Sequence, residues 1–280
     1  MSTVTRLDAV PVVAAETIDV AGSPVTLRRR GPVGPDVGAA AVGEPLLFLH
    51  GAGFTGRWLR FHEALAQGAD VIAPEHVGYG ETPMQDWLED IGDLVLHYDD
   101  LRRALGLERF HLVGYSLGGW IAAAYATLFP DRLRSLTLIT PAGIQVPGKP
   151  PFTDLFTMTP EQLFGTIFND PANIGEVMVD VTDPDVAVHL YEEQSTLARL
   201  VWNPRYDRRM PRRLARVSCP ALVLGAEDDR LVPNEAVDRY AEFLPDARVQ
   251  RIPGTGHALV IEQPEQTAQA ILDFQGSVVR

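Results

Sequence analysis

One stretch of the sequence, HLVGYSLGGWIAAAYA at residues 111–126, restricts the possible folds more than any other. Its first five residues form a short apolar run that is typical of a buried strand, and the residues from Leu117 onward favour a helix. Gly114, Ser116 and Gly118 lie at the junction between the two runs. The stretch therefore predicts a strand, a sharp turn at Ser116 and a helix.

A serine on so sharp a turn needs strained backbone dihedrals, so the residues two before and two after it must be small. Gly114 and Gly118 meet this requirement, and Gly119 adds room. The hydroxyl would project at the end of the sheet, above the positive end of a helix, where an oxyanion is stabilised. The pattern favours a nucleophile elbow, although the same glycines also suit a strand-to-helix turn without a reactive serine.

The segments around the elbow alternate between strand and helix. The expected strands are Thr17–Val20, Val25–Arg30, Leu46–Leu49, Val71–Ala73, His111–Tyr115, Leu133–Ile139, Leu222–Gly225 and Arg248–Ile252. The expected helices of the same region are Trp58–Ala66, Ile91–Leu105, Leu117–Phe129, Asn234–Phe243 and Pro264–Phe274. Such alternation predicts a mostly parallel sheet with helices on both faces, and ligands bind beyond the carboxyl ends of its strands. His50 and Ser116 both fall at those ends.

Between residues 143 and 213 the alternation stops. This segment has no strand candidate, but it has helical runs at 160–168 and 186–201, and a third candidate at 171–181. We therefore expect an α/β core of residues 1–142 and 214–280, with a helical cap at 143–213. Arginines gather where the cap ends. They could steer an anionic substrate, but we expect them to form a solvated face paired with carboxylates. They are Arg205, Arg208, Arg209, Arg212, Arg213 and Arg216.

Composition excludes several classes of partner. The formal net charge of -13 disfavours nucleic acid and anionic membrane surfaces. No run of about 18 apolar residues and no secretory pattern occurs, so we expect a cytoplasmic protein with a small-molecule substrate, as a monomer or homodimer. The single cysteine, Cys219, excludes an intramolecular disulfide. The histidines are scattered and HGAG at 50–53 lacks a phosphate-loop lysine, so we expect neither a metal nor an organic cofactor.

A serine nucleophile needs a neutral imidazole to take its proton and a buried carboxylate to orient that imidazole. His257 lies in the glycine-rich segment PGTGHA, directly after the last expected strand. The carboxylate should follow the preceding strand, where Asp228 and Asp229 are both candidates. His50 also ends a strand, but its ring suits a role in bracing the neighbouring loop.

With these motifs in place, the chain resembles the α/β-hydrolase superfamily. HGAG at 50–53, GYSLGG at 114–119, DRLVP at 229–233 and GTGH at 254–257 occur in the family's order. The resemblance implies an eight-stranded α/β-hydrolase sheet and a helical cap. It selects Asp229, which precedes the family's x-[LIV]-V-P, although the spacing from the preceding strand keeps Asp228 possible. It also implies an oxyanion hole made by the amides of Ala52 and Leu117, with Gly53 as the alternative to Ala52.

The resemblance further implies a serine hydrolase that acts through an acyl-enzyme, most simply on a small carboxylic ester, thioester or lactone. Carbon-carbon bond hydrolases of this family typically carry Pro, Asn and an aromatic residue where this chain has Phe54, Tyr115 and Ala258. Such a hydrolase, an amidase, and a ligand receptor with slow or no turnover remain alternatives.

The cap should also supply an apolar wall for the acyl group. Its residues 152–168 contain more large apolar side chains than a solvent-facing pair of helices tolerates. More than half of them should only attach the cap to the core. We predict a preference for short-to-medium or aromatic acyl esters, and we expect the following residues to bind substrate: Phe54, Tyr115, Phe156, Phe164 and Ala258.

Overall fold

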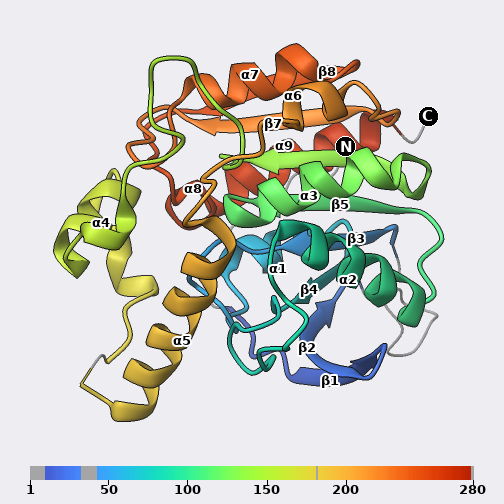
Figure 1. Ribbon diagram of the computed structural model, residues 1–280. Coiled ribbons are helices and arrows are strands. Elements are labelled where there is room, and N and C mark those ends of the chain that lie inside the picture. Colours follow the sequence, from blue (N-terminus) through green and yellow to red (C-terminus); the bar gives the residue numbers. More distant parts are fainter. Residues whose placement is uncertain (1–9, 33–42, 181, 279–280) are drawn as a thin grey trace.

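An eight-stranded sheet passes through the protein in the computed structural model, which describes residues 10–32, 43–180 and 182–278 (Figure 1). The strands are β1 (Ala15–Val20), β2 (Ser23–Arg30), β3 (Pro45–Leu49), β4 (Asp70–Pro74), β5 (Phe110–Tyr115), β6 (Leu133–Ile139), β7 (Ala221–Ala226) and β8 (Ala247–Ile252). Their order across the sheet is β1-β2-β4-β3-β5-β6-β7-β8. The pairs β1/β2 and β2/β4 are antiparallel, and all other pairs are parallel. The predicted mostly parallel sheet of eight strands is confirmed.

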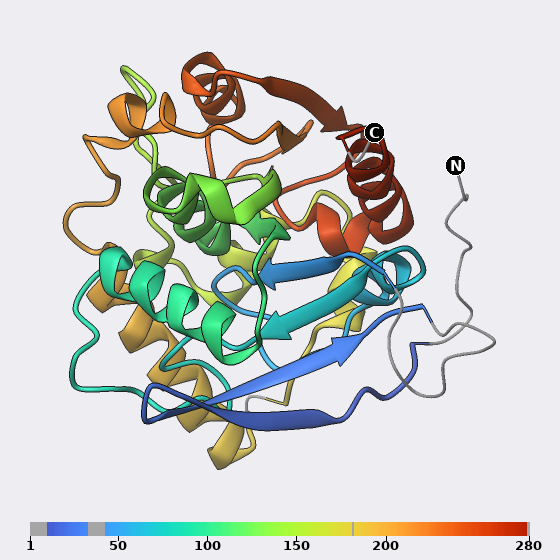
Figure 2. The ribbon, with the colours of Figure 1, turned by 90° about the vertical axis from the view of Figure 1, so that its right-hand side faces the viewer.

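Helices cover both faces of this sheet (Figure 2). The helices that surround the sheet are α1 (Arg60–Ala66), α2 (Ile91–Ala104), α3 (Leu117–Leu128), α6 (Met210–Leu214), α7 (Glu235–Phe243), α8 (Leu259–Glu262) and α9 (Pro264–Val278). α2, α3 and α7 lie on one face, and α1 and α9 lie on the other. Every residue of β5 and β7 is buried, which explains why both strands are apolar without alternation. Within the described ranges, no helix has the length and hydropathy that a membrane span requires.

The ends of α2 show how local sequence sets an element's boundaries. The side chain of Asp90 accepts hydrogen bonds from the amides of Gly92 and Asp93, while the Asp93 carboxylate accepts one from the Asp90 amide. This reciprocal cap satisfies amides that the first helical turn leaves unpaired. At the other end, Gly106 has a φ of 68°, a left-handed conformation that glycine adopts without strain. The helix therefore occupies nearly the range that its sequence predicts.

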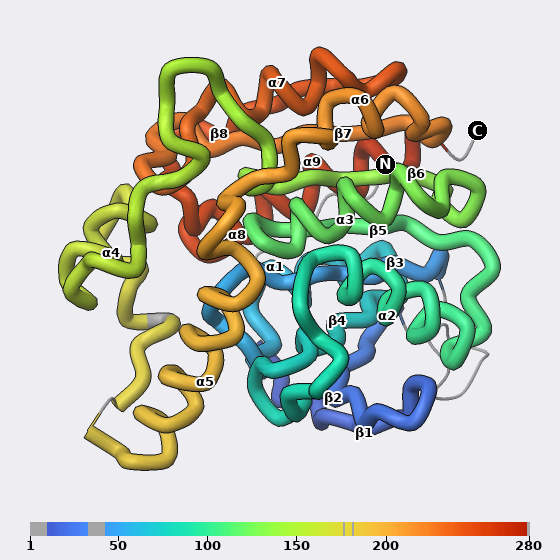
Figure 3. The backbone as a smooth tube through the Cα atoms, in the orientation of Figure 1, coloured from blue at the N-terminus to red at the C-terminus, as the bar shows by residue number. Residues whose placement is uncertain are grey.

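The chain between β6 and α6 leaves the body of the protein and returns, as the tube in Figure 3 shows. It contains α4 (Pro160–Ile167) and α5 (Pro184–Val201), together with short 3-10 helices at Leu155–Thr157 and Pro171–Glu176. The third helical candidate is thus shorter than expected, and in the described part of this segment no strand joins the sheet. α4 and α5 lie beyond the edge of the sheet at which the parallel strands end (Figure 1).

Several arginines at the end of this segment pair with carboxylates, as the sequence suggests. Arg205 lies 3.0 Å from Asp154, while Arg209 and Arg213 both lie beside Asp207, at 3.4 and 2.9 Å. The pairs with Asp207 link residues within the returning chain, and the pair between Arg205 and Asp154 links this chain to the start of the insertion.

Candidate active site

The turn at Ser116 has the geometry of an elbow. Ser116 has φ 54° and ψ -110°, and it lies between the last residue of β5 and the first residue of α3. A Cβ atom at Gly118 would come within 2.1 Å of the Leu49 carbonyl oxygen, and one at Gly114 would come within 2.2 Å of the Gly118 oxygen. Glycine is therefore required at both positions, and the strained serine is held half-buried at the carboxyl edge of the sheet.

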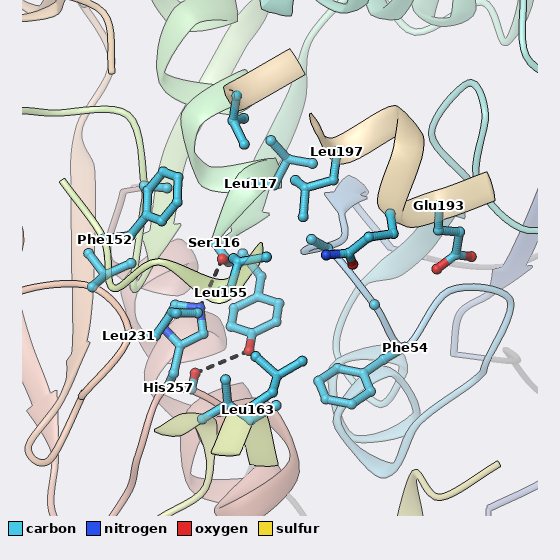
Figure 4. A pocket seen from close by; sticks show the side chains of 18 of the residues that line it. Phe54, Ser116, Leu117, Phe152, Leu155, Leu163, Glu193, Leu197, Leu231 and His257 are labelled. Carbon is cyan, nitrogen blue, oxygen red and sulfur yellow. Dashed lines mark hydrogen bonds between the residues drawn. The ribbon is translucent and has the colours of Figure 1, made fainter. Parts of the chain in front are cut away.

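Three side chains from separate loops form a continuous hydrogen-bonded series. The Ser116 Oγ lies 2.8 Å from Nε2 of His257, and Nδ1 of His257 lies 2.8 Å from Oδ2 of Asp229. Figure 4 shows the serine and the imidazole next to each other at one side of the cavity. Since the carboxylate can only accept, Nδ1 carries the proton and Nε2 is free to accept the serine proton.

The carboxylate of this series is itself fixed. Oδ1 of Asp229 accepts hydrogen bonds of 2.9 Å from the amides of Leu231 and Val232. The side chain of Asp228, in contrast, is exposed, and its amide bonds the Thr255 carbonyl oxygen. Of the two sequence candidates, Asp229 is the one that contacts the histidine.

The loop that carries His257 is bonded on several sides. The Tyr115 hydroxyl donates to the His257 carbonyl oxygen at 3.1 Å, and the Ala258 amide donates to the Ile167 carbonyl oxygen at 2.9 Å. Glu262 adds a second attachment, which the sequence reasoning missed. One of its oxygens accepts from the Gly256 amide at 2.6 Å, and the other accepts from the amides of residues 169 and 170. The histidine loop is thereby joined to the insertion between β6 and α6.

The loop after β3 lies directly against the elbow. A Cβ atom at Gly51 would come within 2.9 Å of the Tyr115 ring, so only glycine allows this approach. Ala52, Gly53 and Leu117 all border the same cavity as Ser116. The amide of Leu117 is the first of α3 and has no helical carbonyl to pair with. The predicted oxyanion residues are therefore gathered beside the serine.

His50 braces this loop from behind. Its Nδ1 donates to the Gly51 carbonyl oxygen at 2.6 Å, and its Nε2 accepts from the His76 amide at 2.9 Å. The His76 ring donates through Nε2 to the His50 carbonyl oxygen at 2.7 Å and accepts through Nδ1 from the Tyr98 hydroxyl. Burial lowers the pKa of His50 to about 4, so its ring is neutral near pH 7. Both imidazole rings thus connect the loop after β3, which contains Gly51, to the loop after β4, which contains His76.

A cavity of about 190 Å³ opens above Ser116 and is mostly apolar. Its wall combines the core with the insertion, as Figure 4 illustrates for part of it. The wall is formed by Ala52, Gly53, Phe54, Tyr79, Tyr115, Ser116, Leu117, Ala142, Phe152, Leu155, Leu163, Ile167, Leu190, Glu193, Gln194, Leu197, Val201, Leu231, Val232 and His257. No lysine or arginine is among these residues, and Glu193 is the only acidic residue. In the part of the chain that the structure describes, His, Cys, Asp and Glu side chains form no group that could hold a metal ion.

Two of the five residues expected to bind substrate line this cavity, namely Phe54 and Tyr115. The other three depart from the expectation. The Phe156 ring packs against Trp202 with a centroid distance of 5.1 Å, and the Phe164 ring packs against Phe168 at 6.2 Å. Ala258, which directly follows His257, is fully buried. Phe156 and Phe164 therefore pack against partners within the insertion, and none of these three residues is in the cavity wall.

The sequence reasoning missed the wall that α5 provides. Leu190, Glu193, Leu197 and Val201 all face the cavity, with spacings of three or four residues that place them on one face of a helix. This spacing in the sequence could have indicated that α5 borders the cavity. The prediction instead chose aromatic residues from 152–168.

Comparisons with known proteins agree with this architecture. A sequence model of the alpha/beta hydrolase family matches residues 46–270. The monoacylglycerol lipase ABHD6 of Mus musculus is 25% identical over 260 residues, which cover 83% of this chain and 76% of that protein. The 2-hydroxy-6-oxo-6-(2'-aminophenyl)hexa-2,4-dienoic acid hydrolase of Metapseudomonas resinovorans is 26% identical over 250 residues, covering 84% and 85%. A solved bacterial membrane phospholipase A superposes with a TM-score of 0.75 and 24% identity, over 96% of this chain and 87% of that one.

Proposed function

Because the chain belongs to the alpha/beta hydrolase family, we propose that it is a serine hydrolase that cleaves small carboxylic esters through an acyl-enzyme. One observation carries this proposal: Ser116, His257 and Asp229 form an unbroken hydrogen-bonded series at the floor of a mostly apolar cavity. A neutral imidazole in this position can accept the serine proton, and the carboxylate stabilises the resulting imidazolium.

The reaction follows from this order of donors and acceptors. Ser116 attacks the acyl carbon while Nε2 of His257 takes the hydroxyl proton, and the imidazolium then protonates the departing alcohol. A water molecule enters, gives its proton to the same nitrogen and attacks the acyl-enzyme. The acid leaves and Ser116 recovers its proton.

We assign the oxyanion hole to the amides of Ala52 and Leu117, with Gly53 as the alternative donor to Ala52. The three residues border the cavity at Ser116, and the hydrogen bonds of His50 fix the course of the loop that carries Ala52 and Gly53. Losing one such donor typically lowers the rate on the order of a hundredfold or more. We propose the insertion at 143–213 as a cap, because α4 and α5 stand over the carboxyl edge of the sheet.

The charges around the cavity favour an ester over the substrate of a carbon-carbon bond hydrolase. The relative from Metapseudomonas resinovorans is named for a dienoic acid, whose carboxylate needs a positive partner in a desolvated site. The cavity wall here contains no lysine or arginine, and Glu193 would repel a second carboxylate. A neutral ester avoids both penalties.

Turnover of p-nitrophenyl esters from acetyl to octanoyl tests this proposal. Each pair of added carbons should raise kcat/KM roughly tenfold until the cavity is full, because a buried methylene contributes about 0.8 kcal/mol. Ser116→Ala should remove the turnover without unfolding the protein. Equal rates along the series would contradict the apolar cavity, and a single turnover with all esters would indicate a receptor instead of an enzyme.

A further inference from the structure

The side chain of Tyr115 lies between three segments that meet at the proposed active site. Tyr115 is the last residue of β5 and directly precedes Ser116, so its main chain belongs to the elbow. The residue is only 5% exposed, and its ring lies so close to Gly51 that a Cβ atom there would come within 2.9 Å of it. The hydroxyl at the end of this ring reaches the loop of His257. One side chain therefore contacts both the loop after β3 and the histidine loop from the elbow.

The main chain and the side chain of His257 are bonded to two consecutive residues. The Tyr115 hydroxyl donates to the His257 carbonyl oxygen at 3.1 Å, and Figure 4 shows this bond as a dashed line. The imidazole Nε2 lies 2.8 Å from the Ser116 Oγ. Asp229 holds the other ring nitrogen, but that bond does not fix the main chain that carries the ring. The hydroxyl of Tyr115 ties this main chain directly to the elbow.

The other hydrogen bonds of the histidine loop run in different directions. The Gly256 amide donates to Glu262, and the Ala258 amide donates to the Ile167 carbonyl oxygen. These two bonds hold the loop relative to α8 and to the insertion, and neither of them reaches the elbow. The bond from Tyr115 therefore has a separate effect, because it sets the position of the loop relative to the nucleophile.

We infer that Tyr115 is a positioning residue, which holds His257 at the distance from Ser116 that proton transfer requires. This role rests on the proposed function. Misplacement of a reacting group by about 1 Å can lower the rate on the order of a hundredfold. Burial raises the pKa of Tyr115, so the phenol keeps the single proton that it donates. Since the His257 carbonyl oxygen already accepts this proton, the hydroxyl has none to donate to a substrate.

Tyr115→Phe tests this role, because it removes the hydroxyl and keeps the ring beside Gly51. With p-nitrophenyl hexanoate, kcat should fall about tenfold, since the imidazole shifts by part of an ångström. KM should stay within about twofold, because acylation and deacylation both use His257 and are slowed alike. The ring that borders the cavity is retained, so the preference along the acyl series should be as in wild type. The rate at which a fluorophosphonate modifies Ser116 should fall by about the same factor as kcat, since it needs the same proton transfer.

Tyr125→Phe is the matched control. Tyr125 is 1% exposed, and its hydroxyl donates to Asp99 of α2 at 3.1 Å. Neither of these two residues borders the cavity. A hydrogen bond to a charged group contributes more than one to a carbonyl, so urea unfolding should show at least as large a loss of stability as in Tyr115→Phe. Both kcat and the labelling rate of Tyr125→Phe should nevertheless equal those of wild type.

The outcomes separate the role of Tyr115 from the proposed function. If wild type hydrolyses no ester and the fluorophosphonate does not modify Ser116, the serine-hydrolase proposal fails and the role of Tyr115 falls with it. If wild type is active and Tyr115→Phe matches Tyr125→Phe in kcat and in labelling rate, only the positioning role is refuted. A loss that appears in KM, or a changed preference along the acyl series, would make Tyr115 a substrate-binding residue instead.

Discussion

Replacing Glu262 should loosen the loop that presents His257. The Glu262 carboxylate is 9% exposed and accepts hydrogen bonds from three backbone amides, at 2.6 Å from Gly256, 2.8 Å from Asn169 and 2.7 Å from Asp170. Gly256 directly precedes the histidine, whereas the other two amides belong to the insertion. One side chain therefore holds the proposed general base and the proposed cap in register.

The size of the effect follows from where the three amides lie. The Gly256 amide is buried, so Glu262→Ala leaves it without a partner, which is unfavourable by about 1–3 kcal/mol. Residues 169 and 170 are half-buried and exposed, so water can bind their amides and the loss is roughly 0.5–1 kcal/mol for each. The free energy of unfolding should thus fall by about 2–5 kcal/mol. A slight shift of His257 should lower kcat/KM about tenfold to a hundredfold.

Urea unfolding and turnover of p-nitrophenyl hexanoate would measure the two effects. Glu262→Gln retains an acceptor for part of the cluster and should fall between wild type and Glu262→Ala. Glu108→Ala removes an exposed carboxylate and controls for the change of charge. If Glu262→Ala unfolds at the same urea concentration as Glu108→Ala and turns over equally fast, the proposed attachment has no energetic or catalytic role.

Three further predictions concern the carboxylate that orients His257, a buried histidine and the turn at Ser116. Asp229→Asn should lower turnover about ten-thousandfold through the wrong histidine tautomer, and Asp228→Asn only about threefold or less; the reverse ranking would assign the role to Asp228. Burial lowers the pKa of His111 to about 4, so below its ordinary value of 6.5 the unfolded chain binds a proton that the folded chain does not. Lowering the pH from 7 to 5 should therefore reduce the free energy of unfolding by about 2 kcal/mol less in His111→Asn than in wild type, as measured by urea unfolding. Equal reductions in the two proteins would contradict the lowered pKa of His111. Gly118→Ala would place a Cβ atom 2.1 Å from the Leu49 carbonyl oxygen, and circular dichroism should show loss of the native fold or a shifted elbow without activity.

The strands and the elbow were predictable because their signals are local. β5 and α3 follow from an apolar run, a helix-forming run and two glycines, and the structure shows why those glycines are needed. Asp228, Asp229 and His257 were within reach because they follow β7 and β8, whose carboxyl ends lie at one edge of a parallel sheet, whereas the preference for Asp229 over Asp228 came from the family resemblance. Such patterns depend on a few neighbouring residues.

The cavity wall was less predictable because it depends on how the insertion docks. The hydrophobicity of Phe156 and Phe164 is the same whether they face the cavity or Trp202 and Phe168, so the sequence alone does not distinguish the two. Glu262 accepts from amides that lie more than ninety residues earlier in the chain, and such an attachment leaves no local pattern.

Covalent labelling tests the central claim most directly. A fluorophosphonate loses fluoride to an activated serine, and mass spectrometry of the digested protein locates the phosphonyl group. We predict a single modification at Ser116, slowed strongly by His257→Gln and absent from Ser116→Ala, with ester turnover lost in parallel. Modification of another serine, or ester turnover that persists in Ser116→Ala, would contradict the account.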